Sequence, residues 1–233
     1  MKVVFVFTLL AILSTSLQAN VTKADLESVR SLRDGSLKNE LRRLMARGQR
    51  SMGYKQAKIA MFSKIDNEDG EVCGVYSRAF CVRTKSIPNN STMNTEHTWP
   101  QSKGAVGIAK SDLHHLYPTK SSINSTRSNY PFCNVSRVKW ENEVSKMGYD
   151  SRGTQCFEVP DFHKGNVARA MFYFSVRYNH GISSDEERVL RQWNDLDPVD
   201  SEELARQKAI ENHQNNTNVF VIDPGLIDQI DNF

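Results

Sequence analysis

The chain has 233 residues and a formal net charge of +3 at pH 7, too small an excess to mark a nucleic-acid-binding protein by itself. Beyond the N-terminus, no stretch is apolar enough over roughly 20 residues to span a bilayer. The four cysteines form no CxxC pair, which argues against a zinc-thiolate site or a redox motif.

Residues 1–19 have the pattern of a secretory signal peptide. Lys2 precedes an uncharged, mostly apolar run over residues 3–13, and small and polar residues follow as far as Ala19. The run is too short for a membrane anchor. We expect cleavage after Ala19, although Leu17 is bulky for its position. The mature protein, residues 20–233, would then carry a net charge of +2 without Lys2 and be soluble, in the periplasm or secreted.

The N-terminal half predicts two helices and two strands. Apolar residues recur at helical spacing within residues 37–50, and a second helix is expected over 54–62. Residues 66–70 have the composition of a turn, strands are expected over 72–76 and 80–83, and a polar loop over 86–94. The apolar positions of the first helix are Leu37, Leu41, Leu44 and Met45.

Basic residues crowd the same region, and two interpretations stay open. The side chains could follow a phosphate backbone, or they could form an ordinary solvated helix face. The residues concerned are Arg42, Arg43, Arg47, Arg50, Lys55 and Lys58.

An even number of cysteines in an exported protein favours two disulfides. Four cysteines permit three pairings, and the local one joins Cys73 to Cys81 and Cys133 to Cys156. We favour the local pairing, with the other two open.

The C-terminal half predicts three helices. Asp161 is expected to cap the first, and Val167, Met171, Phe174 and Tyr178 on one face of it are expected to pack in the core. Ser184 with Glu187, and Asp200 with Glu203, resemble capping pairs that begin the other two. A tail of undefined structure follows Pro224. These elements predict a single α+β domain, richer in helix than in strand.

Residues 94–132 hold the candidate chemistry. Three of the six histidines lie within residues 97–115, close to a carboxylate and a carboxamide. Hydrolysis of a phosphodiester needs a base that works near neutral pH, and histidine is suited to that role. It also needs a nearby cation, and Mg²⁺ prefers a few oxygen ligands. His97 can supply the base, and Glu96 and Asn124 the ligands.

The local geometry supports this division of roles. Adjacent residues of an extended segment point to opposite sides, so Glu96 and His97 are not expected to face the metal together. Asn124 is expected on a short helix after Pro118, with its side chain directed back over the strand.

Three motifs together resemble the endonuclease I family of periplasmic and secreted bacterial nucleases, within the ββα-metal (His-Me finger) superfamily. They are Glu96-His-Thr-Trp-Pro100, Asp112-Leu-His-His-Leu116 and Asn124-x-x-Arg-Ser-Asn129. The resemblance extends over roughly residues 37–222. It implies a finger made of the strand bearing His97, a second strand near Asp112–Leu116 and the helix bearing Asn124.

The same resemblance implies an activity and a cofactor. His97 would be the general base, and Glu96 and Asn124 would hold Mg²⁺, with Mn²⁺ or Ca²⁺ as substitutes. The substrate would be DNA, with RNA left open, cut by a monomer with little regard for base sequence.

The sequence departs from the family pattern in two places. Some members have a phosphate-contacting arginine after the histidine, where this chain has only Lys103 and Lys110; either lysine, or Arg127, could replace it. A purely structural role for Arg127 is an alternative of equal weight to contact with the phosphate. Residues 214–220 lack a glycine and a proline of the family pattern, which puts the conformation of that loop in doubt. Asp112, His114 and His115 are expected to be structural.

The sequence leaves two other functions to consider. A zinc peptidase would need a second histidine where the chain has Met93, so this class is disfavoured. A non-catalytic, exported nucleic-acid-binding protein is the main alternative, although a pure binder needs no base beside a metal site. Metal-dependent nicking of a plasmid distinguishes the two.

Overall fold

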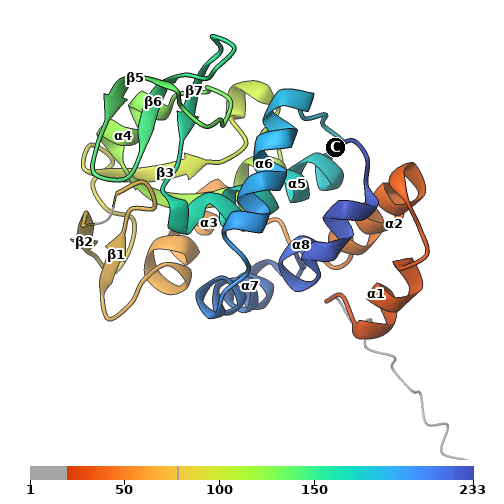
Figure 1. Ribbon diagram of the computed structural model, residues 1–233. Helices are drawn as coiled ribbons and strands as arrows, with labels where there is room; N and C mark the ends of the chain where they lie inside the picture. The colour runs from red at the N-terminus through yellow and green to blue at the C-terminus, as the bar shows by residue number, and fades with distance from the viewer. Residues whose placement is uncertain (1–19, 78) are drawn as a thin grey trace, which may run out of the picture.

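The computed structural model describes residues 20–77 and 79–233, and the expected signal peptide at residues 1–19 lies outside them (Figure 1). Within the described part of the chain, no helix is both long and apolar enough to cross a bilayer. Helices and three small antiparallel sheets make up the structure. The expected mixed class, with more helix than strand, is therefore confirmed.

The helices and turns occur in the following order. The α-helices are α1 (Lys23–Val29), α2 (Asp34–Ala46), α3 (Tyr54–Ala60), α4 (Ser121–Arg127), α5 (Lys164–Tyr178), α6 (Ser184–Leu196), α7 (Ser201–Gln214) and α8 (Val219–Ile222). A π-helical turn, η1 (Met61–Ile65), continues α3. Short 3-10 turns are η2 (Gln101–Lys103), η3 (Ala109–Ser111), η4 (Leu113–His115), η5 (Asp161–His163) and η6 (Pro224–Gln229).

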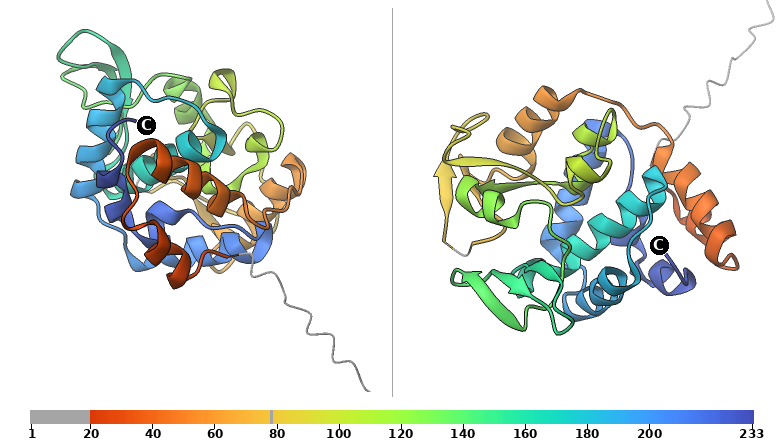
Figure 2. Two further views of the ribbon diagram at one scale, coloured as in Figure 1. Left: turned by 90° about the vertical axis from the view of Figure 1, so that its right-hand side faces the viewer. Right: turned by 90° about the horizontal axis from the view of Figure 1, so that it is seen from above.

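Helix α5 is the central element of the fold. The structure buries it on all sides rather than on one face, with Tyr178 only partly covered. Helices α2, α6 and α8 pack against it, and Figure 2 shows it among them. Its charged Arg169 is only 1% exposed, because the Glu203 carboxylate of α7 accepts hydrogen bonds from it at 2.6–3.0 Å. Charged groups that are buried in the core of a protein need such partners.

The strands form three separate antiparallel sheets. They are β1 (Glu71–Cys73) with β2 (Cys81–Arg83), β3 (Met93–His97) with β4 (Leu116–Lys120), and β5 (Arg137–Glu141), β6 (Lys146–Tyr149) and β7 (Gln155–Glu158) in that order. The first two strands are shorter than expected. The chain leaves β1 at Gly74, where an added Cβ would lie 3.1 Å from the backbone nitrogen of Lys120. The backbone therefore turns toward β4, and the Val75 amide donates to the Pro118 carbonyl.

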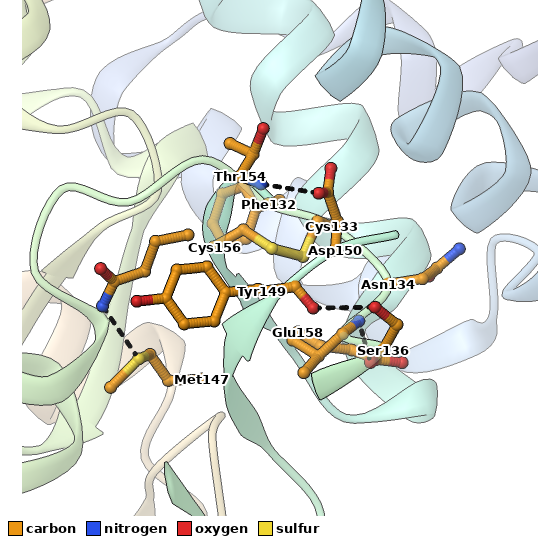
Figure 3. The surroundings of a disulfide bond; sticks show 12 residues. Phe132, Cys133, Asn134, Ser136, Met147, Tyr149, Asp150, Thr154, Cys156 and Glu158 are labelled. Carbon is orange, nitrogen blue, oxygen red and sulfur yellow. Dashed lines mark hydrogen bonds between the residues drawn. A yellow bond between two sulfur atoms is a disulfide. The ribbon is translucent and has the colours of Figure 1, made fainter. Parts of the chain in front are cut away.

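Both disulfides have the local pairing. Cys73 is bonded to Cys81 and Cys133 to Cys156, and the described chain holds no free cysteine. The first bridge joins directly paired residues of β1 and β2. The second, shown in Figure 3, connects the segment before β5 to β7. Each closes a short loop, and such a crosslink typically stabilises a fold by about 2–4 kcal/mol.

Helix ends in the C-terminal half differ in part from the expected caps. Asp200 caps α7 as predicted and accepts from the Glu203 amide at 2.8 Å. The cap of α6 is Ser183 rather than Ser184. Asp161 does not cap α5; it lies in η5 and forms an ion pair with Lys164 at 2.7 Å. The Asp161 carboxylate is thus engaged by Lys164, three residues further along the chain, instead of by a backbone amide at the start of α5.

The C-terminal tail is part of the core. After Pro224 the chain forms η6, and Leu226, Ile227 and Ile230 are buried. The Phe233 ring lies 4.2 Å from that of Phe172, centroid to centroid. Apolar burial of these side chains holds the tail against α5.

Candidate active site

Strands β3 and β4 with helix α4 form the framework of the site. The two strands pair over five positions, with Glu96 opposite Tyr117 and His97 opposite Leu116, and α4 packs on both. The second strand therefore begins at Leu116 and not near Asp112 as expected. The Asp112 carboxylate accepts from the His114 amide at 3.0 Å and caps the turn η4, which keeps residues 113–115 out of the strand.

Asn124 is held directly over β3. Its side-chain nitrogen donates to the Asn94 side-chain oxygen at 2.8 Å and to the Thr95 carbonyl at 3.2 Å. The short helix after Pro118 thus brings this side chain back over the strand, as the sequence predicted. Because the amide nitrogen is committed to β3, the carboxamide oxygen Oδ1 is the atom left for a ligand.

A cavity of about 310 Å³ brings the three predicted residues together. Glu96, His97 and Asn124 all line it. The two side chains nevertheless have separate surroundings: the Glu96 carboxylate contacts Tyr76, and the His97 ring contacts the Lys110 carbonyl. That they do not face a metal ion together stays a prediction. His97 is the last residue of β3 and the chain bends at Thr98, so the cavity extends around the end of the strand. The other lining residues are Thr95, Pro100, Gln101, Ser102, Ser128 and Asn129.

The loop after β3 is held by packing. The Trp99 indole stacks on Phe174 at 4.7 Å, and its nitrogen donates to the Lys103 carbonyl at 2.9 Å. Gly104 has φ +116°, and a Cβ there would come within 2.6 Å of the His180 ring. Only glycine fits such a position without rearrangement. These contacts position the loop, and Gln101 and Ser102 of this loop line the cavity.

The surroundings of His97 determine which ring nitrogen is basic. Nε2 lies 3.1 Å from the Lys110 carbonyl oxygen, which can only accept a hydrogen bond, so Nε2 carries the proton. Nδ1 then holds the lone pair, and the Gln101 side-chain nitrogen lies 3.4 Å from it. Burial, followed by the neighbouring His115, lowers the pKa of His97 to about 3. The imidazole is therefore neutral at physiological pH.

Glu96 is a buried carboxylate held by two side chains. Its Oε1 accepts from the Tyr76 hydroxyl at 2.9 Å and lies 2.8 Å from Arg127 Nε. The Arg127 contact is an ion pair with a poorly aligned N–H, since that nitrogen makes no hydrogen bond of good geometry. Burial raises the pKa of Glu96 above its ordinary value, although the Arg127 charge acts in the opposite direction.

Arg127 occupies a structural position. The side chain is 1% exposed, and its terminal nitrogens donate to the carbonyls of Ser128, Tyr130 and Thr98 at 2.9–3.0 Å. Its donors are thus engaged inside the protein. Of the two interpretations of Arg127, this geometry favours the structural one.

The two candidate lysines lie in different places. Lys103 lines a neighbouring cavity of about 290 Å³ and does not line the one that contains His97. Lys110 holds His97 through its carbonyl, and its ammonium lies 5.0 Å from the centroid of the Tyr54 ring. Lys58 lies 4.8 Å from the same ring, which packs against His97 at 5.4 Å. The sequence did not predict that Tyr54 and Lys58 lie close to His97.

Three of the six basic residues in the N-terminal stretch are engaged within the protein. Arg43 pairs with Glu40 and Arg47 with Asp25, while Arg42 donates to the Val176 carbonyl. These three side chains are committed to packing and ion pairs. For Arg50, Lys55 and Lys58 both interpretations stay open.

Asp112 is a buried carboxylate that accepts hydrogen bonds from several side chains, which favours the expected structural role over metal binding. Its Oδ2 accepts from the hydroxyls of Tyr173 at 2.7 Å and Tyr178 at 2.6 Å, and its Oδ1 from Gln214 at 2.7 Å. The side chain of Gln49 donates to Oδ2 as well. Burial raises the pKa of Asp112, but neighbouring charges and these donors outweigh it, and the net shift is downward.

The two remaining histidines of the segment and the C-terminal loop belong to the same buried network. His114 Nε2 contacts the Asn216 carbonyl and His115 Nε2 the Ala109 carbonyl, at 3.2 and 2.7 Å. Asn215, at the position of the missing family glycine, has φ +62°. Asparagine tolerates that left-handed conformation better than most residues, so the loop keeps its turn.

Comparison with known proteins identifies the family of this chain. The model of a family described as Endonuclease I matches residues 34–225. The chain belongs to the endonuclease I family. An extracellular ribonuclease of Bacillus amyloliquefaciens is 31% identical over 220 residues, covering 84% of this chain and 73% of the relative. An extracellular deoxyribonuclease of Aeromonas hydrophila is 28% identical over 110 residues, covering 47% and 48%.

A third relative extends the comparison within this family. Endonuclease-1 of Buchnera aphidicola subsp. Acyrthosiphon pisum is 32% identical over 112 residues, covering 48% of this chain and 44% of the relative. The relatives are thus named for ribonuclease, deoxyribonuclease and endonuclease activities, and two are named extracellular. The family membership inferred from the three sequence motifs is confirmed.

Proposed function

We propose that this protein is an exported, metal-dependent endonuclease that hydrolyses phosphodiester bonds with little sequence preference. One observation carries the proposal: a neutral imidazole with an outward lone pair lies beside a carboxylate and a carboxamide oxygen in one cavity. Membership of the endonuclease I family supports the reaction class.

His97 would act as the general base. Its Nδ1 is unprotonated and lines the cavity side where Gln101 lies, and the Lys110 carbonyl keeps the ring in this tautomer. A water bound near Nδ1 could pass a proton to it as the water attacks phosphorus. The resulting imidazolium would keep its hydrogen bond to the carbonyl, which stabilises the charged form.

Glu96 and Asn124 would hold the cation. The donor set consists of oxygens, a carboxylate and a carboxamide, which suits Mg²⁺ better than a soft ion, with Mn²⁺ or Ca²⁺ as substitutes. Tyr76 and Arg127 both contact Glu96 Oε1 and so orient the carboxylate. A bound cation would stabilise the charge that develops on the phosphate and the leaving oxygen.

The substrate would be nucleic acid recognised through its phosphates. No base-reading module is apparent in the sequence, and contacts to phosphates carry no direct sequence information. Lys58 and Lys110, whose ammonium groups lie 4.8 and 5.0 Å from the centroid of the Tyr54 ring, are suited to attract the backbone near His97. DNA is the proposed substrate, and the extracellular ribonuclease among the relatives leads us to test RNA beside it. We propose a monomer that acts in the periplasm or the medium.

Plasmid DNA and a structured RNA, each incubated with purified protein and Mg²⁺ or with EDTA, test this function. We expect nicked and then linear plasmid with Mg²⁺ and no cleavage with EDTA. Sequencing the ends produced from random fragments should show little preference for any motif. Binding without cleavage would instead identify a non-catalytic nucleic-acid-binding protein, and EDTA-resistant cleavage would refute the metal dependence.

A further inference from the structure

A second cavity, of about 550 Å³, lies on a different part of the molecule from the site of His97. It is bordered by β1, β4, η5 and the start of α7, and it shares no lining residue with the first cavity. None of the residues given a catalytic or ligand role lines it. It is therefore separate from the candidate active site.

The lining is strongly acidic in a chain of positive net charge. The acidic residues are Asp66, Glu68, Glu71, Asp200, Glu202 and Glu203. Two of them are neutralised, Asp66 by Arg206 and Glu203 by Arg169. Within residues 20–77 and 79–233 no ion pair involves the other four. The cavity therefore repels phosphate and attracts cations.

Two buried polar groups at the wall have no partner. The side chains of Ser77 and His163 line the cavity and are 8% and 5% exposed. Ser77 Oγ and His163 Nε2 make no hydrogen bond. Buried polar atoms are nearly always satisfied, so a pair of orphans beside one cavity indicates a polar ligand that reaches them.

The arrangement does not suit a single metal ion. Within the described chain, three metal-ligating atoms approach one another only at Glu71, Cys73 and Cys81, and both cysteines are in a disulfide. The acidic charges are thus spread along the cavity. Between them lie apolar and aromatic walls, including Ile65, Tyr117 and Phe162. Such walls suit methylene groups, and the aromatic faces also attract ammonium groups.

We propose that this cavity binds a linear polyamine, an aliphatic chain with several spaced ammonium groups. The ammonium groups would contact the exposed carboxylates, and one would donate to the unpartnered Ser77 and His163. The methylene segments would lie against Ile65 and the exposed Phe162.

Calorimetric titration of the full-length mature protein with spermine at low salt tests the proposal. The variant Glu68→Gln/Glu71→Gln/Glu202→Gln removes three charges from the cavity. The matched control, Glu27→Gln/Asp195→Asn/Asp228→Asn, removes three exposed charges elsewhere. We expect one spermine per chain, with affinity about tenfold or more weaker in the cavity variant and nearly unchanged in the control.

A second variant tests the buried end without changing any charge. Ser77→Ala should weaken spermine binding several-fold, with the circular dichroism spectrum retained. Equal loss in the two charge variants would mean diffuse attraction and would overturn the proposal. So would unchanged affinity in Ser77→Ala, or binding of MgCl₂ alone to this cavity in place of spermine. These measurements do not depend on nuclease activity, so they test the polyamine site independently of the proposed function.

Discussion

The Nε2 atom of His97 lies 3.1 Å from the carbonyl oxygen of Lys110, thirteen residues further along the chain. Because a carbonyl cannot donate, this contact leaves Nδ1 as the basic nitrogen on the cavity side of the ring. A loop rather than a carboxylate therefore orients the base. The ring stays neutral because burial disfavours the charged imidazolium and lowers the pKa of His97.

Replacement of the base should separate catalysis from binding. His97→Ala removes the group that accepts the proton of the attacking water, and we expect single-turnover cleavage to fall by about 10²–10⁴-fold. Mg²⁺ affinity by calorimetry and DNA affinity by gel shift with Ca²⁺ should be close to wild type. Cleavage near the wild-type rate would refute the role of His97 as the base.

Replacement of Glu96 should have the opposite effect on metal binding. Glu96→Gln keeps the shape of the side chain and a partner for Tyr76, but it removes the charge, so Mg²⁺ binding should weaken and cleavage should be lost. Glu96→Ala is a poor substitute, because it strands the buried Arg127 charge and is expected to cost about 3–5 kcal/mol of stability. Unchanged Mg²⁺ affinity in a folded Glu96→Gln would show that Glu96 is not a ligand.

Asp112 should matter for stability rather than for metal binding. Asp112→Ala leaves the buried hydroxyls of Tyr173 and Tyr178 and the amide of Gln214 without an acceptor, each at a cost of about 1–3 kcal/mol. We expect a loss of several kcal/mol in urea unfolding, and a smaller loss for Asp112→Asn, which keeps one oxygen. A variant as stable as the wild type would contradict this structural role.

Buried histidines should make the fold sensitive to acid. Burial lowers the pKa of His163 to about 3 and that of His115 to about 4, and it lowers the pKa of His114 as well. Below the ordinary value of about 6.5 the unfolded chain binds protons that the folded chain does not. Stability is therefore fully present above about pH 7 and declines as the pH falls from about 6.5 toward these lowered values.

The contribution of a single histidine to this acid sensitivity can be measured. Each such histidine contributes a slope of at most about 1.4 kcal/mol per pH unit. His163→Gln should remove one such contribution, so its free energy of unfolding in urea should depend less steeply on pH between 6.5 and 5. Parallel profiles for the wild type and the variant would show that His163 is not part of the effect.

The sequence by itself determined the features that depend on residues close to one another along the chain. The spacing of apolar residues predicted the buried face of α2, and the acidic side chain of Asp200 predicted the start of α7. The disulfides close short loops, so the local pairing could be favoured. The three motifs around Glu96, His97 and Asn124 identified the family, because two adjacent strands and a following helix bring near neighbours in sequence together.

Only the tertiary structure decided which groups surround those residues. The partners of Glu96 are Tyr76, twenty residues earlier, and Arg127, which the sequence could not distinguish from a phosphate ligand. Asp112 meets Tyr173 and Gln214 across 61 and 102 residues. The tail after Pro224 has no regular pattern, yet it is held by packing on α5. Such contacts depend on how preformed elements pack against one another, and packing joins residues regardless of their distance along the chain.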